Sequence, residues 1–351
     1  MLFIWENCFH QFEQNVKDTG SPKLLFENLD LTPIHHILWK NLHTDGPGRP
    51  IEYNPVWDLR ALMLKQLLQI PYVKDLAKRL SRDTYLREAC GYSDKTPTEA
   101  HFTQMKRRIG VEGFKEIERW LRKEALRIRE AQPLSAVGLI QAACIDGTDI
   151  PAWSSRDPHD TKKWRGDPDA RVGRTKKGAF DLGYLSLMMA DIEGFCLGHV
   201  ESSLNVNEKK LMEPLLDSVL GDDIEVELLS ADSQFESGEL FMALESRKLE
   251  HVIPWRRLKG RANPPDVLSV KNKIDVEGPE HLRSVYHRLR APNEGLFGRA
   301  KCRLSLSRFT WQGLDNVCIH VCLALFVAYG VCIVAHLIGR PELRQSVAYF
   351  A

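Results

Sequence analysis

The spacing of apolar residues changes near Gln132-Pro133, and this change constrains the fold more than any other feature of the chain. Before it, apolar residues recur at helical spacing in 58–68, 73–80 and 114–128. After it, short apolar runs alternate with turn signals and helical stretches. Strands are predicted over 139–145, 179–190, 195–202, 225–231 and 251–254, and helices over 207–220, 237–248, 292–307 and 314–338. This order of elements calls for an all-helical region followed by a mixed sheet covered by helices.

The length and composition fit two ordinary globular domains. The chain has 351 residues, of which 43% are hydrophobic and 27% are charged, as in a globular rather than a disordered protein. We therefore expect a helical N-terminal domain over residues 1–132 and a mixed α/β domain over residues 133–345.

The basic residues are unevenly distributed, although the formal net charge is only +1. Segment 162–177 holds seven Lys or Arg residues and two acids, and segment 283–308 holds seven and one. A local basic patch can bind a polyanion even when the total charge is near zero. A basic run is also often just a solvated surface, so each patch by itself leaves both interpretations open.

The eight cysteines are scattered singly and form no C-x-x-C pair. Cys318 and Cys322 flank His320, but no second pair of ligands accompanies them, so a zinc site is not expected there. Buried free thiols in a reducing cytoplasm are the better interpretation. The N-terminal residues lack a basic start followed by an apolar run and a cleavage site, so no secretory signal is predicted.

The segment 317–338 is long and apolar enough to cross a membrane. The alternative is a buried core helix. We favour this alternative because a mixed sheet covered by helices can bury such a segment. The expectation is therefore a cytoplasmic protein with no membrane partner.

Asp146 and Asp232 each follow directly on an apolar, strand-like run. Strand ends present polar side chains to a shared crevice, and a third acid, Glu294, lies alone in the basic segment 283–308. Magnesium prefers oxygen ligands of this kind, and two ions about 4 Å apart can assist the cleavage of a phosphodiester. A single Asp at a strand end more often caps a turn, and Asp149 competes with Asp146, so this pattern alone leaves a metal site open.

A short helix is predicted to begin at Thr96-Pro97, which suit the N-cap and the first turn. Its polar residues are of the types that reach DNA bases and phosphates: His101, Gln104, Lys106 and Arg107. An ordinary surface helix explains the same residues equally well.

The stretch Tyr286-His287-x2-Arg290-x3-Glu294-x6-Lys301 resembles the Tyr-x2-Arg-x3-Glu-x6-Lys signature of insertion-sequence DDE transposases. The Arg, Glu and Lys spacings match. The aromatic residue stands one position early, at Tyr286, and His287 occupies the signature position.

Further motifs resemble the same family in the same order. Asp232-Ser-Gln-Phe235 is similar to its second-aspartate motif, and Ile145-Asp146-Gly147-Thr148 is similar to its first. Several stretches between residues 48 and 102 resemble its helical N-terminal region. The resemblance thus extends from residue 40 or so to residue 340 or so.

The resemblance implies a ribonuclease-H-like fold, with a mixed five-stranded sheet flanked by helices. It implies that Asp146, Asp232 and Glu294 are catalytic and hold two magnesium ions, for which manganese can substitute. The DNA-contacting residues that it implies in the signature are Tyr286, His287, Arg290 and Lys301. Such an enzyme nicks double-stranded DNA at the terminal inverted repeats of a transposon, and the freed 3′-hydroxyl then attacks target DNA. The family also implies a homodimer on paired ends, in the nucleoid-associated cytoplasm of a prokaryote.

Three other functions remain possible from the sequence. They are a DNA-binding relic or repressor of transposition that no longer cuts, a membrane-anchored protein, and a ribonuclease-H-like nuclease without strand transfer. The intact Asp, Asp and Glu set argues against the first, and the large helical N-terminal half argues against the last.

Pro292 fits the first turn of a helix and not its middle, so Arg290 is expected in the loop before the helix.

Overall fold

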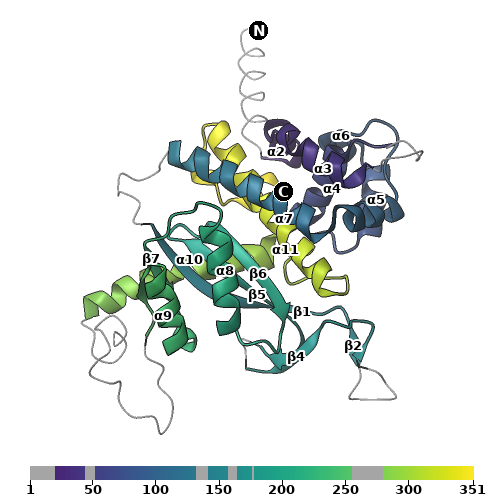
Figure 1. The fold of residues 1–351 in the computed structure, drawn as a ribbon. Helices are drawn as coiled ribbons and strands as arrows, with labels where there is room; N and C mark the ends of the chain where they lie inside the picture. The colour runs from purple at the N-terminus through teal and green to yellow at the C-terminus, as the bar shows by residue number, and fades with distance from the viewer. Residues whose placement is uncertain (1–19, 44–51, 132–140, 157–163, 176–177, 255–279) are drawn as a thin grey trace, which may run out of the picture. The chain divides into compact units, whose positions relative to one another are not determined.

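The computed structural model describes residues 20–43, 52–131, 141–156, 164–175, 178–254 and 280–351 (Figure 1). The chain forms two compact units. Unit 1 comprises Met1–Leu134, Arg303–Ser305 and Val321–Ala351, and unit 2 comprises Ser135–Cys302 and Leu306–His320. The domain limits 1–132 and 133–345 stay a prediction; by their contacts, residues 321–345 belong to unit 1.

Where it is described, unit 1 contains only helices. Three of them begin at side chains that accept a first-turn N–H group, those of Ser21, Asn54 and Asp83. Pro22 and Pro55 occupy first-turn positions, where their missing N–H group costs nothing. The helices are α2 (Pro22–Asn28), η1 (Thr32–Ile34), α3 (His35–Leu42), α4 (Pro55–Leu67), α5 (Val73–Arg82), α6 (Thr84–Cys90), α7 (Glu99–Ala131), η3 (Pro341–Leu343) and α12 (Val347–Phe350).

The helix predicted from Thr96-Pro97 and the one predicted over 114–128 form a single element, α7. Gly110 inside it has φ 65° and ψ 175°, so the helix kinks at that residue. Glycine adopts a positive φ without a steric penalty. After the kink, Phe114 and Leu121 are fully buried, as the apolar spacing predicts.

Among the described residues, helix α11 (Leu314–Leu337) is long and apolar enough to span a membrane, with a mean hydropathy of 2.6. In the structure, 94% of its most apolar window is buried in the protein. From Val321 onward its residues belong to unit 1. There the ring of Phe326 stacks on that of Phe114 with centroids 6.1 Å apart, and the hydroxyl of Tyr329 donates to Glu118 at 2.9 Å.

Unit 2 is built on a mixed sheet, as predicted. The central strand β1 (Ala142–Pro151) pairs antiparallel with β5 (Phe180–Asp191) and parallel with β7 (Leu228–Ala231). Strand β7 in turn pairs parallel with β8 (Glu250–Val252). On the other side, β6 (Cys196–Ser203) and the short β4 (Arg171–Arg174) pair antiparallel with successive parts of β5.

The predicted five strands are therefore present in the order β6-β5-β1-β7-β8, which is the ribonuclease-H-like arrangement. Strand β4 adds a sixth, within the basic segment 162–177, where no strand was predicted. Two further short strands, β2 (Ser155–Arg156) and β3 (Trp164–Arg165), form a separate pair.

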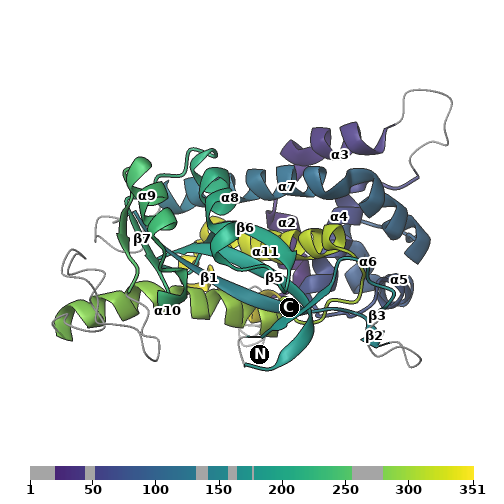
Figure 2. The ribbon, with the colours of Figure 1, turned by 60° about the horizontal axis from the view of Figure 1, so that its bottom comes forward.

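Helices cover both faces of this sheet. Figures 1 and 2 show α8 (Lys209–Leu220) on one face and α10 (Glu280–Arg303) on the other. Helix α8 buries Met212, Leu215 and Val219, which lie on one side of the helix. Helix α9 (Gly238–Ser246) connects β7 to β8.

Two boundaries differ from the prediction in ways that matter for the site. The sequence predicts a turn after Ile145, but β1 continues to Pro151, because every residue from Asp146 onward still pairs with β5. Helix α10 begins at Glu280, so Arg290 lies inside the helix and not in a loop before it.

Candidate active site

The two aspartates lie side by side at the end of paired strands. Strands β1 and β7 are parallel, and the last paired residues are Ile145 and Ala231. Asp146 is the next residue of β1, Asp232 follows directly on the last residue of β7, and neighbouring strands are about 4.8 Å apart. The sheet topology therefore brings these two carboxylates together, although 85 residues separate them in the chain.

Backbone and side-chain groups orient both carboxylates. Asp232 caps the 3-10 helix η2 (Ser233–Phe235): its Oδ1 accepts the N–H of Gln234 at 3.0 Å and the hydroxyl of Ser233 at 3.1 Å. Asp146 Oδ1 accepts the N–H of Gly147 at 2.8 Å. These bonds occupy one oxygen of each carboxylate, and the Oδ2 atom of Asp232 faces helix α10.

Arg290 of α10 lies across from both aspartates. Its Nη2 is 3.3 Å from Asp232 Oδ2. Burial lowers the pKa of Arg290, but Tyr286, Asp232 and Asp146 together raise it above its ordinary value. Arg290 therefore provides a fixed positive charge beside the two carboxylates.

The same charges act on Cys144, two residues before Asp146. Burial raises the pKa of its thiol to about 12, the charge of Arg290 opposes this rise, and Asp146 and Asp232 add to it. Cys144 is 1% exposed. Cys144 is therefore a buried, protonated thiol close to the carboxylates and not a nucleophile.

Tyr286, the aromatic residue that is one position early for the signature, is buried. It is 2% exposed, and its hydroxyl donates to the carbonyl oxygen of Ala231 at 3.2 Å. Its ring lies 5.7 Å from the guanidinium carbon of Arg290. Tyr286 thus holds both the strand end that carries Asp232 and the arginine that faces it, whereas the neighbouring His287 is exposed.

Glu294 lies one helical turn after Arg290 and is exposed. Helix geometry places Arg290, Glu294 and Lys301 on one side of α10. Among the residues that the structure describes, no three His, Cys, Asp or Glu side chains lie close enough to hold one metal ion. The structure therefore brings Asp146 and Asp232 together but not all three carboxylates.

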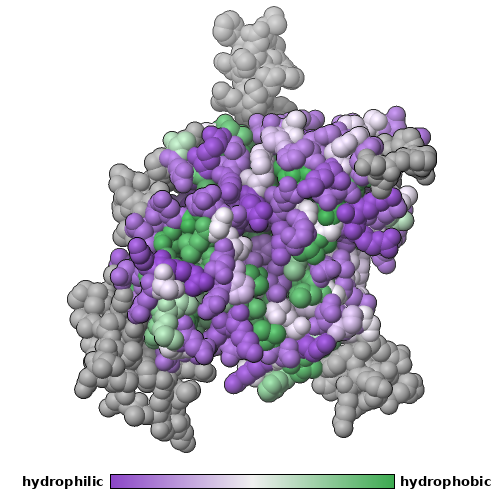
Figure 3. Space-filling view, viewed as in Figure 1, coloured by the Kyte–Doolittle hydropathy of each residue, from purple (hydrophilic) through white to green (hydrophobic). Residues whose placement is uncertain are grey.

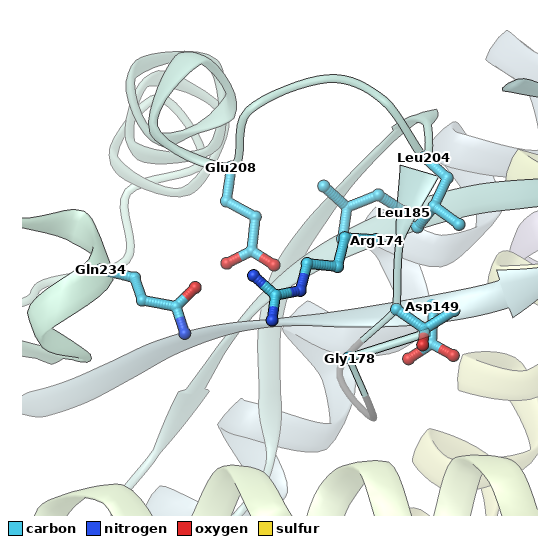
Figure 4. Close-up of a pocket in the computed structure, with 8 residues that line it drawn as sticks. Asp149, Arg174, Gly178, Leu185, Leu204, Glu208 and Gln234 are labelled. Carbon is cyan, nitrogen blue, oxygen red and sulfur yellow. The ribbon is translucent and has the colours of Figure 1, made fainter. Parts of the chain in front are cut away.

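Asp149 has a different setting from Asp146. Side chains three residues apart in a strand point to opposite faces, and Asp149 pairs with Lys301 at 3.4 Å. It lines a cavity of about 410 Å³ together with Arg174, Glu208 and Gln234 (Figure 4). Sequence reasoning did not single out these last three residues. The available signals were the basic segment around Arg174 and the Asp232-Ser-Gln motif.

The four predicted DNA-contacting residues of unit 1 differ in whether they have a partner or are buried within the protein. His101 Nε2 lies 2.7 Å from Asp58 Oδ2, and Lys106 is only 5% exposed. Burial, with the neighbouring charge of Lys65, lowers the pKa of Lys106 to about 7. Gln104 and Arg107 are exposed. Because its ammonium group is buried, Lys106 does not reach a DNA phosphate in this conformation, so burial argues against a direct DNA contact.

Two family models match the sequence. The model described as "Transposase domain (DUF772)" matches residues 10–108, and the model described as "Transposase DDE domain" matches residues 138–329, more than half of the chain. The chain belongs to the DDE transposase family. This transposase is accordingly an enzyme of DNA transposition, which cleaves DNA and transfers strands, as the sequence motifs predict.

Solved structures of other transposases are similar to this one at low sequence identity. A cryo-EM structure of the piggyBac transposase synaptic complex with hairpin DNA is 10% identical, with 93% of this chain and 79% of that chain covered and a TM-score of 0.46. The Mos1 strand transfer complex is 12% identical, with 84% and 81% covered and a TM-score of 0.23. A Mos1 paired-end complex with the left transposon end is 12% identical, with 84% and 82% covered and a TM-score of 0.22. A comparison with curated proteins gave no match.

Proposed function

We propose that Asp146, Asp232 and Glu294 are the catalytic carboxylates of this transposase and hold two divalent metal ions, magnesium or manganese. The ends of the mobile element and the target duplex are the DNA substrates. The enzyme acts as a homodimer on paired ends, in the nucleoid-associated cytoplasm of a prokaryote.

One observation carries the proposal most directly: the parallel register of β1 and β7. It places Asp146 next to Asp232 at the end of the sheet, where polar groups of α/β proteins meet their ligands. Because two adjacent carboxylates repel one another, they need a positive charge between them. Arg290 supplies part of that charge in the structure, since its Nη2 lies 3.3 Å from Asp232.

The donor set fits a hard divalent cation. Asp146 and Asp232 offer carboxylate oxygens, and magnesium is commonly held by one or two carboxylates with water and substrate phosphate as the other ligands. When bound, such ions polarise the phosphodiester and lower the pKa of a bound water. In the structure the three carboxylates do not lie close enough to hold one ion. The proposal therefore includes a movement of Glu294 toward Asp146 and Asp232, which makes it the third metal-binding carboxylate.

The basic residues of α10 position the DNA. Arg290 and Lys301 are each about one third exposed or less, and each contacts one aspartate, Asp232 and Asp149 respectively. A phosphate group can replace a carboxylate as the partner of either cation. DNA binding would thereby draw Arg290 away from Asp232 Oδ2 and leave that oxygen available to a metal ion.

The test is metal-dependent nicking of a duplex taken from the DNA that flanks the gene. Asp232→Asn keeps the size of the side chain but removes the charge, so nicking should be lost while DNA binding and melting temperature are kept. Asp217→Asn is the matched control, because Asp217 is 64% exposed and pairs with Arg247 on a different part of unit 2. Undiminished nicking by Asp232→Asn would overturn the assignment.

The alternative of a silent DNA-binding relic gives a different result. In that case the wild-type chain binds the flanking DNA but does not nick it with magnesium or manganese. No feature of the described residues favours this alternative over the active enzyme.

A further inference from the structure

Asn293 on α10 differs from most polar side chains of this protein in being buried without a hydrogen bond. Figure 3 shows a largely hydrophilic face, as expected when polar groups hydrogen-bond to water. Asn293 is only 1% exposed, and neither its amide nitrogen nor its amide oxygen has a partner in the described part of the chain. Among the described residues, no other side chain has two such atoms. Burying unpaired polar atoms costs stability, so this amide calls for an explanation.

Another buried polar atom without a partner lies on the sheet that α10 covers. Ser230 of β7 is 0% exposed, and its hydroxyl has no hydrogen-bond partner among the described residues. Ser230 pairs with Cys144 of β1 in the parallel register, and residues in register project on the same face of a sheet. The Asn293 amide lies beside the Cys144 thiol, which is only a weak hydrogen-bonding group. Asn293 and Ser230 are therefore neighbours between α10 and the sheet.

The two proposed catalytic aspartates lie on the same face, one step further along each strand. Side chains alternate between the faces of a strand, so Cys144 and Asp146 project on the same side of β1. Asp232 continues β7 in an extended conformation, so it shares its face with Ser230. Residues two apart in a strand are separated by about 6.6–6.8 Å. The unpaired polar atoms thus lie directly behind the two carboxylates.

A single buried water molecule suits this arrangement. Buried waters typically make about three hydrogen bonds to polar groups that otherwise lack partners. The Nε atom of Arg290, three residues before Asn293, is also buried and without a partner among the described residues. A water molecule here would accept an N–H group of the Asn293 amide and donate to oxygens of Asp146 and Asp232. The hydroxyl of Ser230 can donate to the same water molecule or accept from it.

Hydrogen bonds of this kind matter for a metal site. Partners behind the ligands fix the direction in which the ligand oxygens point, and their loss typically weakens metal binding about 10–100-fold. An amide that is buried only as packing has the opposite signature. An apolar side chain of the same size would then improve stability and leave metal binding unchanged.

We propose that Ser230 and Asn293 are positioning residues, which orient Asp146 and Asp232 toward the metal ions through a water molecule buried between them. The proposal rests on the proposed function, because it takes Asp146 and Asp232 as residues that hold the ions. Ser230 and Asn293 act through the aspartates and do not contact DNA, since both are buried.

The test measures Mn²⁺ binding to the full chain by electron paramagnetic resonance, without DNA, together with the melting temperature without metal. Asn293→Leu replaces the amide by an apolar group of similar size. It should weaken Mn²⁺ binding on the order of 10–100-fold. The melting temperature should stay equal or rise, because two buried unpaired atoms are removed.

Asn316→Leu is the matched control, because Asn316 is partly exposed on α11 and its amide donates to Gln312 O at 2.8 Å. This variant should keep the Mn²⁺ affinity of the wild type. Equal Mn²⁺ affinity of Asn293→Leu and Asn316→Leu would overturn the proposal. So would a melting temperature of Asn293→Leu that falls together with the affinity, because the amide would then serve the fold.

A second variant tests the shared water molecule. Ser230→Ala should also weaken Mn²⁺ binding without lowering the melting temperature. Because both side chains act through one water molecule, the double variant should bind Mn²⁺ no more weakly than Asn293→Leu alone. Effects of the two substitutions that add in full would contradict the proposal.

The outcomes separate this proposal from the proposed function. If Asp146→Asn weakens Mn²⁺ binding and Asn293→Leu does not, only the positioning role is removed. If Asp146→Asn leaves Mn²⁺ binding unchanged, the proposed metal site itself is wrong. Mn²⁺ binding that depends on Asn293, in a chain that does not nick DNA, removes only the proposed catalytic function.

Discussion

Two charged clusters occupy the same sheet and differ in their access to solvent. His199 Nδ1 and Glu201 Oε1 on β6 are 2.8 Å apart, and their side chains are 3% and 1% exposed. Ser186 also donates to Glu201 Oε1, at 2.9 Å. At the ends of β1 and β7, the contact between Arg290 and Asp232 is longer, at 3.3 Å, and the side chains are 25% and 28% exposed.

The difference in exposure indicates what each cluster can do. We call the pair His199 and Glu201 the closed cluster, and the pair Arg290 and Asp232 the open cluster. Burial alone would raise the pKa of Glu201, but His199 and the hydroxyl of Ser186 lower it, so the carboxylate keeps its charge. Neither partner can leave, because water cannot replace it. In the open cluster, Asp232 can exchange Arg290 for a metal ion, and Arg290 can exchange Asp232 for a phosphate, at little cost, since water reaches both groups. We infer that the closed cluster stabilises the sheet and that the open one serves the reaction.

The largest effect is expected within the open cluster, where Asp146 and Asp149 compete for the catalytic role. Asp146→Asn should lower the rate of metal-dependent nicking roughly 1,000-fold or more, as the loss of a central catalytic group does. Asp149→Asn should lower it on the order of tenfold or less, because Asp149 faces the cavity and Lys301. Single-turnover nicking measures both rates. A larger loss for Asp149→Asn would exchange the roles of the two aspartates.

The closed cluster should respond in stability. Glu201→Ala leaves His199 without its buried partner and should lower the free energy of unfolding by about 3–5 kcal/mol. Urea unfolding measures this change. Asp217→Ala breaks the exposed ion pair with Arg247 and should cost only about 0–1 kcal/mol. Similar losses for the two variants would show that solvent access does not separate the clusters.

Local patterns in the sequence predicted most of the elements that make up these clusters. Strands β5 and β6 were predicted close to their observed limits, because each is rich in apolar residues and the turn signal Asp191-Ile192-Glu193-Gly194 separates them. The continuation of β1 past Asp146 was missed. Its Gly and Thr residues are typical of a turn, and only pairing with β5 keeps them extended.

Long-range contacts account for the other differences. Helix α10 begins well before Pro292, and its contact between Tyr286 and Ala231 cannot be read from the spacing of residues in the chain. The apolar helix α11 was predicted correctly as a helix, but its partners from Val321 onward are helices of unit 1. Apolar composition predicts that a surface is buried but not which surface covers it.

Lys106 and Lys65 are two like charges that are both buried, in contrast to the opposite charges of the closed cluster. Burial, with the charge of Lys65, lowers the pKa of Lys106 to about 7, and burial lowers that of Lys65 to about 8. Unfolded lysine titrates near 10.4, so between these values the unfolded chain binds more protons than the folded one. The destabilisation is therefore complete below pH 7 or so and disappears as the pH rises toward 10 or so.

The free energy of unfolding should consequently be higher at pH 9 than at pH 6.5, by on the order of 2 kcal/mol. Lys106→Met should remove most of this difference in urea unfolding experiments. Lys123→Met on the exposed side of the same helix is the control and should keep it. An unchanged pH dependence in Lys106→Met would mean that this lysine is charged in the folded protein.

The smallest effect is expected at Tyr286, which contacts both a buried group and a partly exposed one. Its hydroxyl donates to the buried Ala231 O, and its ring faces the partly exposed Arg290. Tyr286→Phe should lower the free energy of unfolding by about 0.5–1.5 kcal/mol, the net value of one hydrogen bond. It should leave DNA affinity within twofold of the wild type, because a buried hydroxyl does not reach a phosphate. His287→Ala, at the exposed neighbouring position, should weaken DNA binding without affecting stability. If Tyr286→Phe weakened DNA binding instead, the tyrosine would have to leave its buried position on the DNA-bound enzyme, and the strand end that carries Asp232 would move with it.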